Sequence, residues 1–246
     1  MMKTVTSGLT TRYFGDLSEN ELEQIILIGD DRIRQIPVAD KGEDFVNLTE
    51  TCSGVFFDDS KKDVQRFSGS IFYARKTISN MLEEAARILP DNYFILLKEC
   101  YRPLSIQTRI FNSRTARLKG KYPEWTEEQI YDECCRLTAP PDVGPHPSGA
   151  AVDLTLVDSN KKEYDMGTIL NAQSDETKNT AYTFCPYISD EAKKNRSILI
   201  KAMTQAGFVN YPTEWWHWSY GDRYWAFQLN RPHALYGSVD GEPPVI

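Results

Sequence analysis

The amino-acid sequence predicts a single α+β domain with a central, mainly antiparallel sheet flanked by helices. Three observations support this fold class. Residues 150–157 alternate between apolar and polar side chains, as in a strand with one face in a core. Residues 72–89 and 189–206 carry apolar side chains at helical spacing. No internal repeat or linker divides the 246 residues, so we expect one domain over 1–246, with about residues 1–60 packed on it as an extension.

The first part of the chain predicts two helices and a buried strand. Ser18 and Glu21 have the spacing of a capping box, so a surface helix is expected to begin at Ser18. The amphipathic helix over 72–89 comes next. The run 93–97 is short and rich in strand-forming residues, and as a buried strand it would deliver residues 98–102 to its end.

Two more helices are expected before the alternating strand. Pro103 would open the first of them. Thr126 and Gln129 form a second candidate capping box, for a helix that would reach Leu137. In the strand that follows, Asp153 projects from the face opposite the apolar one.

The last part of the chain predicts a long helix and two aromatic strands. The helix over 189–206 would end at Gly207 as its cap. The segments 215–220 and 224–229 are rich in aromatic residues, and we expect them to form a hairpin that turns through Gly221 and Asp222.

Composition and charge exclude several classes of function. The formal charge of −7, without clustered Lys and Arg, argues against nucleic acid or an anionic membrane surface as a partner. The apolar runs are too short to span a bilayer, and the amino-terminal segment lacks the apolar stretch of a secretory signal. Five cysteines, with no pair two residues apart, do not resemble a disulfide framework or a thiolate zinc site. A reducing cytoplasm is the simplest location, and a homo-oligomer is compatible with the sequence.

The candidate chemistry lies in two of the three histidines. His146 precedes Asp153 by a turn and a few strand residues, and His217 ends the run Glu-Trp-Trp-His at 214–217. A catalytic zinc site needs three nitrogen or oxygen ligands and an open position, and two imidazoles with one carboxylate satisfy that count. We therefore predict one Zn²⁺ per chain, bound by His146, Asp153 and His217.

Glu214 is then free to act as a general base. Bound zinc lowers the pKa of its water toward about 7, and a carboxylate within reach can take the remaining proton and later give it to the leaving amine. In a regular strand Glu214 and His217 would face opposite sides of the sheet. A bulge, a loop or the start of a strand is therefore expected near Glu214, so that it turns toward the metal.

Other interpretations of the same residues stay open at this point. Each histidine alone is more often a structural side chain than a ligand, and the tryptophans at 215, 216 and 218 are more often core than pocket wall. Two histidines and one carboxylate also form the iron site of non-haem Fe(II) oxygenases, although such an enzyme does not require Glu214. A third alternative is a binding module that uses its metal as a structural clamp.

Several motifs, taken together, resemble one family. The run His-x-x-Gly-x-Ala-x-Asp at 146–153 is followed by Glu-Trp-Trp-His at 214–217. Further matches occur in the expected order over about residues 60–220: Phe67-Ser68-Gly69 followed by Tyr73, Tyr101-Arg102-Pro103, Asp153-Leu154-Thr155-Leu156, and Met166-Gly167-Thr168. This pattern is similar to that of the D-alanyl-D-alanine dipeptidases, the VanX-like branch of the zinc peptidases, which also contains D,D-carboxypeptidases.

The resemblance implies a zinc metallopeptidase that hydrolyses a short peptide, such as a D-Ala-D-Ala-like dipeptide, in cell-wall metabolism. It assigns the same three metal ligands, makes Glu214 the catalytic base, and makes Arg102 the group that stabilises the oxyanion. The simpler alternative for Arg102 is a salt bridge with Glu99. The residues expected to bind the substrate are Asn171, Tyr73, Trp216 and Ser148.

The sequence departs from the family pattern where the substrate is selected. Gly144 and Pro145 occupy places where Ser is usual before the first ligand, and Arg66 replaces a frequent Asn. Asn171 stands where the family tends to have an Asp that binds the free amine, and Asp175 is a possible substitute. A neutral amide pairs less strongly with an ammonium group than a carboxylate does. A D,D-carboxypeptidase, or a biosynthetic peptidase or amidase acting on a modified dipeptide, therefore remains an alternative.

Overall fold

The described residues form a five-stranded sheet with the order β2-β4-β5-β7-β6. The computed structural model describes residues 25–58, 60, 72–172 and 178–241. β2 runs parallel to β4, and the remaining neighbours are antiparallel. The strands are β2 (Val55–Phe57), β4 (Phe94–Glu99), β5 (Ala151–Val157), β7 (His217–Ser219) and β6 (Val209–Asn210). The predicted α+β class with a mainly antiparallel sheet is confirmed.

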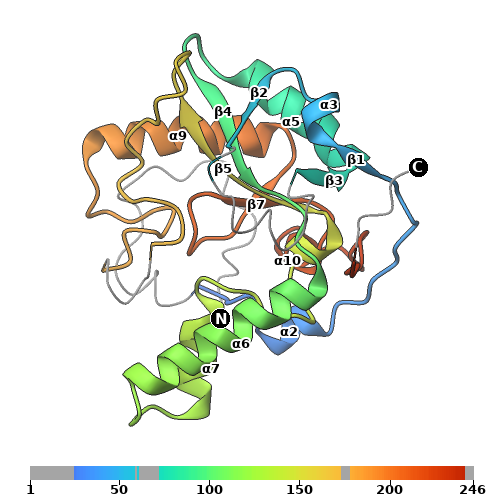
Figure 1. The fold of residues 1–246 in the computed structure, drawn as a ribbon, viewed down its shortest axis with the longest axis vertical. Coiled ribbons are helices and arrows are strands. Elements are labelled where there is room, and N and C mark those ends of the chain that lie inside the picture. Colours follow the sequence, from blue (N-terminus) through green and yellow to red (C-terminus); the bar gives the residue numbers. More distant parts are fainter. Residues whose placement is uncertain (1–24, 59, 61–71, 173–177, 242–246) are drawn as a thin grey trace.

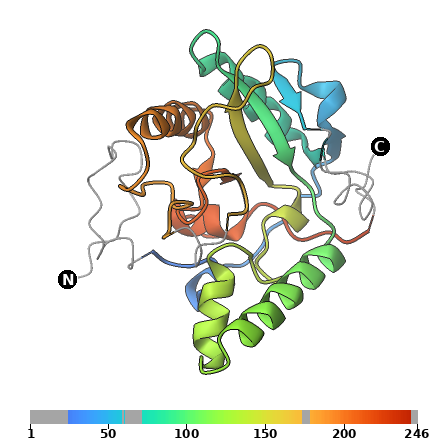
Figure 2. The ribbon, with the colours of Figure 1, turned by 60° about the vertical axis from the view of Figure 1, so that its left-hand side comes forward.

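Two helices pack together against one face of this sheet, and they hold the main core. They are α5 (Lys76–Ile88) and α9 (Asp190–Gln205), which lie side by side in Figures 1 and 2. Leu82 and Met203 from these helices share one buried cluster with Leu154 from the sheet. Burial of this apolar face supplies the main driving force for folding and leaves the opposite face of the sheet free for polar residues.

A helical hairpin lies apart from this layer, at the lower end of the molecule in Figure 1. It consists of α6 (Leu104–Lys121) and α7 (Glu127–Cys135). The capping box predicted at the start of α7 is confirmed, because Thr126 accepts from the Gln129 amide and the Gln129 side chain accepts from the Thr126 amide. The helix ends at Cys135, two residues before the expected Leu137.

The amino-terminal segment contributes α2 (Asp31–Arg34), β1 (Phe45–Asn47) and α3 (Leu48–Thr51). β1 pairs with β3 (Tyr73–Arg75), which is why the helix predicted over 72–89 begins only at residue 76. The edge strand β2 also comes from this segment, so the packing of the extension includes sheet pairing. The capping box proposed at Ser18 lies outside the described residues.

The predicted aromatic hairpin at the end of the chain is wrong in its second half. Residues after the turn form a short helix, α10 (Arg223–Gln228), and not a strand. Asp222 is its N-cap, because its side chain accepts a hydrogen bond from the backbone N–H of Trp225. An Asp at this position satisfies an amide that would otherwise have no partner, and this local bond outweighs the strand preference of the aromatic residues.

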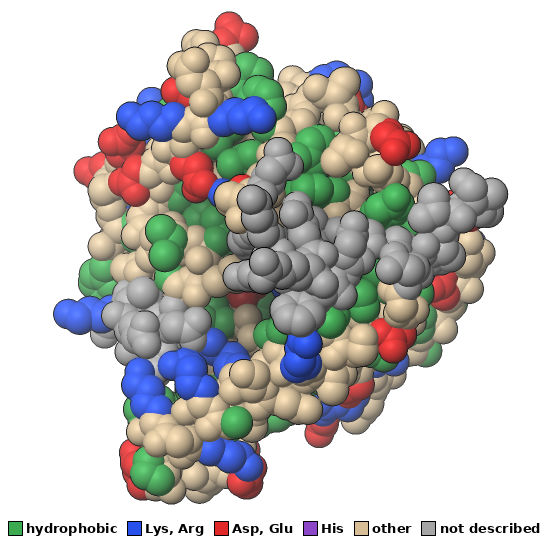
Figure 3. Space-filling view, viewed as in Figure 1, with side chains coloured by type: hydrophobic (Ala, Val, Ile, Leu, Met, Phe, Trp, Pro, Cys, Tyr) green, Lys and Arg blue, Asp and Glu red, His purple; other side chains and the backbone are tan. Residues whose placement is uncertain are grey.

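The surface of the described residues carries mixed charge. Figure 3 shows acidic side chains spread around the rim of one face, and a group of Lys and Arg side chains just above the α6–α7 hairpin. Among the helices that the structure describes, none combines the length and the apolar character needed to cross a bilayer.

Candidate active site

Three polar residues lie in one row across the polar face of the sheet. Asp153 on β5 is paired with Glu99 on β4 and with His217 on β7. Directly paired residues on neighbouring strands project from the same face, so these three side chains lie close together. The register of β4 shifts between Leu97 and Glu99, which places two residues of β4 opposite Asp153. The sheet therefore brings together side chains that are far apart in sequence.

His146 comes from a short 3-10 turn, η2 (His146–Ser148), just before β5. The turn closes at Gly149, whose φ of 70° lies in the left-handed region, and a Cβ there would come within 2.3 Å of the Phe45 ring. The Nδ1 atom of His146 lies 2.6 Å from the carbonyl oxygen of Cys100. A carbonyl only accepts, so Nδ1 carries the proton and the lone pair of Nε2 faces Asp153, 3.4 Å away.

The second histidine approaches the same carboxylate with its other nitrogen. Nδ1 of His217 lies 2.9 Å from Oδ1 of Asp153, and the two imidazole rings have centroids 4.9 Å apart. One donor atom from each of His146, Asp153 and His217 lies within 4.8 Å of the others, and all three residues are buried. Two nitrogens and one carboxylate oxygen that converge in this way fit a divalent cation with a further coordination position for a solute. The structure thus brings together the three predicted ligands.

The electrostatics of the three groups suit a metal site. Burial opposes the ionisation of Asp153, but His146 and His217 together hold its pKa below the usual value. Burial lowers the pKa of His217, with Asp153 acting in the opposite direction. An ionised carboxylate and a neutral imidazole are the protonation states in which these groups bind a metal.

Glu214 lies in the turn that precedes β7, so the predicted start of a strand near this residue is confirmed. The turn is tight, because the His217 amide donates to the Glu214 carbonyl at 3.2 Å. The side-chain amide of Asn210 donates to the carbonyls of Glu214 and His217. Oε2 of Glu214 lies 3.7 Å from Nδ1 of His217. Burial, reinforced by Asp153, raises the pKa of Glu214 well above its ordinary value. A carboxyl group with a raised pKa next to a metal site is suited to carrying a proton.

Arg102 follows β4 and reaches the same site. Its Nε donates to Glu99 at 2.6 Å, so the salt bridge considered from the sequence is present. Its Nη1 donates to Oε1 of Gln107 at 2.8 Å. Arg102 nevertheless lines the same cavity as the three candidate metal ligands. The ion pair and a position at the site are therefore compatible.

The three candidate ligands, Glu214 and Arg102 line a cavity of about 30 Å³. Of the predicted substrate-binding residues, Asn171 lines it, whereas Trp216 is fully buried in the core, Tyr73 lies on β3, and Ser148 borders another hollow. The substrate roles of these residues remain predictions. A larger hollow of about 380 Å³, where β2 and β4 begin, contains none of the metal ligands.

The cavity also has lining residues that the sequence did not indicate. These are Ile28, Gln107, Leu137, Thr138, Ala139 and Tyr211. They come from the amino-terminal segment, α6, the chain after α7, and the turn before Glu214. Tyr211 links two of these segments, because its hydroxyl donates to the Cys135 carbonyl at 2.6 Å and accepts from the Ile28 amide at 3.1 Å. No local pattern marks such residues, because each is selected by contacts with distant parts of the chain.

The chain is similar to one protein family and to several known proteins. Residues 61–237 match the family described as D-Ala-D-Ala dipeptidase. A D-alanyl-D-alanine dipeptidase from Synechocystis sp. is 32% identical over 200 residues, which cover 70% of this chain and 81% of that protein. A D-alanyl-D-alanine dipeptidase from Escherichia coli is 39% identical over 72 residues, or 29% of this chain and 35% of that protein. The solved structure of the LdcB LD-carboxypeptidase is 19% identical with a TM-score of 0.42, over 78% of this chain and 75% of that chain.

Proposed function

The chain belongs to the D-Ala-D-Ala dipeptidase family and is a metallopeptidase, and on this basis we propose that it hydrolyses a short, D-Ala-D-Ala-like dipeptide with one Zn²⁺. We assign His146, Asp153 and His217 as the metal ligands. The observation that supports this most is their convergence within 4.8 Å in a cavity that also contains Glu214 and Arg102. Membership of a peptidase family favours a hydrolase over the oxygenase alternative, and the Glu214→Gln variant separates the hydrolase from a binding module that has kept the fold.

The reaction needs a proton carrier and a group that stabilises negative charge. When bound, the divalent cation supplies Lewis-acid chemistry, because it polarises a carbonyl group and lowers the pKa of water. Glu214 takes a proton from the water as its oxygen bonds to the carbonyl carbon, and delivers that proton to the amide nitrogen as the C–N bond breaks. The products are a carboxylic acid and an amine, which exchange a proton to give a carboxylate and an ammonium group. The positive charge of Arg102 favours the oxyanion that forms on the carbonyl oxygen.

Asn171 lies at the exposed side of the cavity, where it can contact the substrate. Its backbone has a φ of 59°, a left-handed conformation that Asn tolerates better than most residues. As a neutral amide, Asn171 can accept a hydrogen bond from a free amine but can equally bond to a blocked amino group. We therefore expect weaker selection for a free amino terminus than a carboxylate at this position would give.

The substitution Glu214→Gln tests the proposed mechanism directly. It keeps the shape of the side chain and removes the proton carrier, so kcat should fall by roughly 10²- to 10⁴-fold. The zinc content, measured by elemental analysis, should stay at one ion per chain, because Glu214 is not a ligand. Equal kcat values for this variant and the wild type would rule out Glu214 as the base.

A substrate screen tests the assignment of the peptide. The zinc-loaded protein is assayed for amine release with D-Ala-D-Ala, L-Ala-D-Ala, L-Ala-L-Ala and an N-acetylated D-Ala-D-Ala. We expect the free D,D-dipeptide to be hydrolysed. The rate for the acetylated peptide should lie within about tenfold of that rate, a difference equivalent to about 1.4 kcal/mol. Exclusive cleavage of the acetylated peptide would move the assignment to a carboxypeptidase, and hydrolysis of none would exclude a peptidase acting on these substrates.

A further inference from the structure

The guanidinium group of Arg102 is held by two hydrogen bonds on two of its edges. Nε donates to Glu99 at 2.6 Å and Nη1 donates to Gln107 at 2.8 Å. A planar guanidinium held by one bond can still rotate about that bond, whereas a second bond in the same plane fixes its orientation. Among the residues that the structure describes, no hydrogen bond involves Nη2. The remaining N–H groups of Arg102 are thus left for a ligand in the cavity.

Gln107 is itself held so that its oxygen must face Arg102. Its amide nitrogen donates to the carbonyl oxygen of Ala139 at 2.7 Å, and its side chain is buried, with 1% exposed. A carbonyl oxygen only accepts hydrogen bonds, and a guanidinium only donates them. A flipped amide would place two acceptors together at Ala139 and two donors together at Arg102. One orientation of Gln107 is therefore strongly favoured, and it presents an acceptor to the guanidinium.

We infer that Gln107 is a positioning residue, which fixes the guanidinium plane of Arg102 so that its remaining N–H groups face the oxyanion. This inference rests on the proposed function, because it concerns how the group assigned to the oxyanion is oriented. Glu99 neutralises the buried charge of Arg102 by itself, so replacing Gln107 leaves the ion pair in place. The contribution of Gln107 is then to orientation, which matters most when negative charge develops in the transition state.

The first test replaces Gln107 by Leu, which has a similar size and cannot accept a hydrogen bond. We expect kcat of Gln107→Leu to fall about 10- to 100-fold with KM changed less than threefold, because misplacement of an oxyanion group affects the transition state more than substrate binding. The control is Thr108→Ala on the same helix, whose hydroxyl donates to the Leu104 carbonyl of that helix. That control should keep the wild-type kcat.

A double-mutant cycle separates positioning from a general structural role. We expect Arg102→Ala to lower kcat about 10²- to 10³-fold, as removal of an oxyanion donor does. In that background, Gln107→Leu should change kcat less than twofold, because there is no guanidinium left to orient. If the fold-decreases in kcat of the two single variants multiply in the double variant, the inference is overturned, because Gln107 would then act independently of Arg102.

A conservative variant covers the case in which Gln107→Leu does not fold. Gln107→Glu keeps an oxygen that can accept from Nη1 but loses the donor to the Ala139 carbonyl, so its kcat should fall clearly less than that of Gln107→Leu. Zinc content and thermal melting are measured for each variant. Equal losses in the Glu and Leu variants would overturn the inference. If Arg102→Ala lowers kcat but Gln107→Leu does not, only the inference fails. If Arg102→Ala keeps the wild-type kcat, the proposed oxyanion role fails and the inference with it.

Discussion

His146 and His217 face Asp153 with different ring nitrogens, and this difference follows from their local surroundings. His146 donates from Nδ1 to the Cys100 carbonyl, so its Nε2 faces the site. His217 faces the site with Nδ1 itself. A backbone carbonyl that binds the distal nitrogen of a ligand fixes its tautomer and orientation. Substitutions that move the backbone at Cys100 should therefore weaken metal binding, although Cys100 is not a ligand.

Asp58 provides a test of stability in acid, because it pairs with the buried amine of Lys98 at 2.7 Å. Burial opposes its ionisation, but the bonds from Lys98 and Ser60 lower the pKa of Asp58 to about 2. A pKa below the unfolded value stabilises the folded state above about pH 4, and this contribution is lost as the pH falls to about 2. After allowance for screening by solvent, we expect it to be worth roughly 1 kcal/mol.

The measurement is the free energy of unfolding in denaturant, taken at several values between about pH 5 and pH 2. Asp58→Asn should be less stable than the wild type near pH 5 and should lose less stability as the solution is acidified. In a Lys98→Met background, Asp58→Asn should have little effect on the slope of the unfolding free energy against pH, because the amine that shifts the pKa of Asp58 is absent. An identical slope for Asp58→Asn and the wild type would contradict the assignment.

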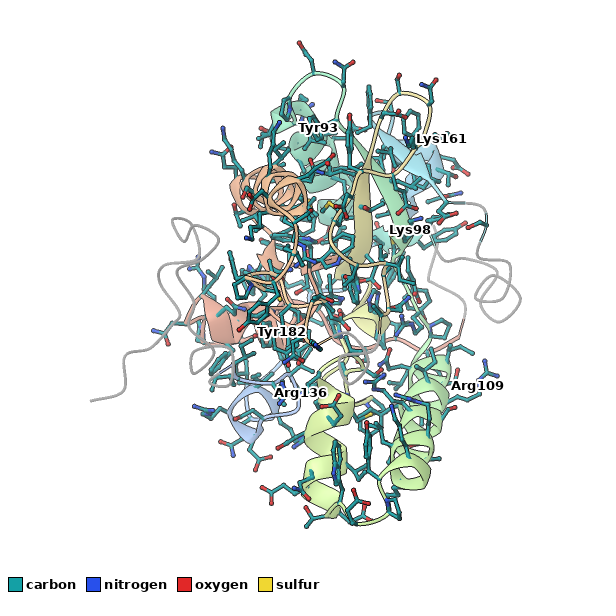
Figure 4. The ribbon with its side chains drawn as sticks, turned by 90° about the vertical axis from the view of Figure 1, so that its left-hand side faces the viewer. Tyr93, Lys98, Arg109, Arg136, Lys161 and Tyr182 are labelled. Carbon is teal, nitrogen blue, oxygen red and sulfur yellow. The ribbon has the colours of Figure 1, made fainter. Side chains whose placement is uncertain are left out.

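At the scale of single elements, α9 connects the loop that carries Asn171 to the turn that carries Glu214. The link is Arg196, which is buried and lies over the ring of Trp215 at 5.5 Å. Its guanidinium donates to backbone carbonyls of two loop segments, namely those of Met166, Thr180, Tyr182 and Thr183. Tyr182 in turn packs beside Arg136 at the end of α7 (Figure 4). Helix α9 thus holds both the loop that carries Asn171 and the turn that carries Glu214.

Replacement of Arg196 by Met should lower the free energy of unfolding by about 3 kcal/mol or more, because several buried carbonyls lose their donor. The measurement is urea unfolding. The matched control is Lys193→Met on the exposed side of the same helix, where a 3.4 Å pair with Asp190 should be worth less than about 0.5 kcal/mol. A loss in Arg196→Met no greater than in this control would mean that the carbonyl bonds contribute little.

At the scale of the whole molecule, the metal should contribute to global stability. Buried Asp153, Glu99 and Glu214 lie close together, and the positive charge near them includes that of Arg102, so a bound divalent ion adds compensating charge. A ligand that binds only the folded state at 100 times its Kd adds about 2.7 kcal/mol. We expect a chelator to lower Tm by several degrees.

The control for metal removal is Asp153→Asn, which loses a ligand. Its Tm should respond much less to the chelator than that of the wild type, because it binds the metal weakly in the first place. Metal content is measured alongside by elemental analysis. A wild-type Tm that stays constant while the metal is removed would show that the site does not contribute to stability.

Much of the fold followed from local patterns in the chain. The alternation at 150–157 predicted β5, and the Thr126 capping box predicted where α7 begins. The hairpin at the end of the chain was predicted wrongly, because Asp222 caps a helix among aromatic residues that otherwise favour strands. Local patterns are reliable where one local interaction dominates, and they fail where two compete.

The sequence by itself determined the class of chemistry, because two histidines and an aspartate in a recognisable pattern, with a glutamate beside the second histidine, define the donor set and the base. Only the tertiary structure decided which atoms of these residues meet, and that Glu99 and Gln107 hold Arg102 at the same cavity. The physical reason is that ligand type is a property of a side chain, whereas distance and orientation come from the pairing of β4, β5 and β7 and the docking of α6, which join residues far apart in the chain.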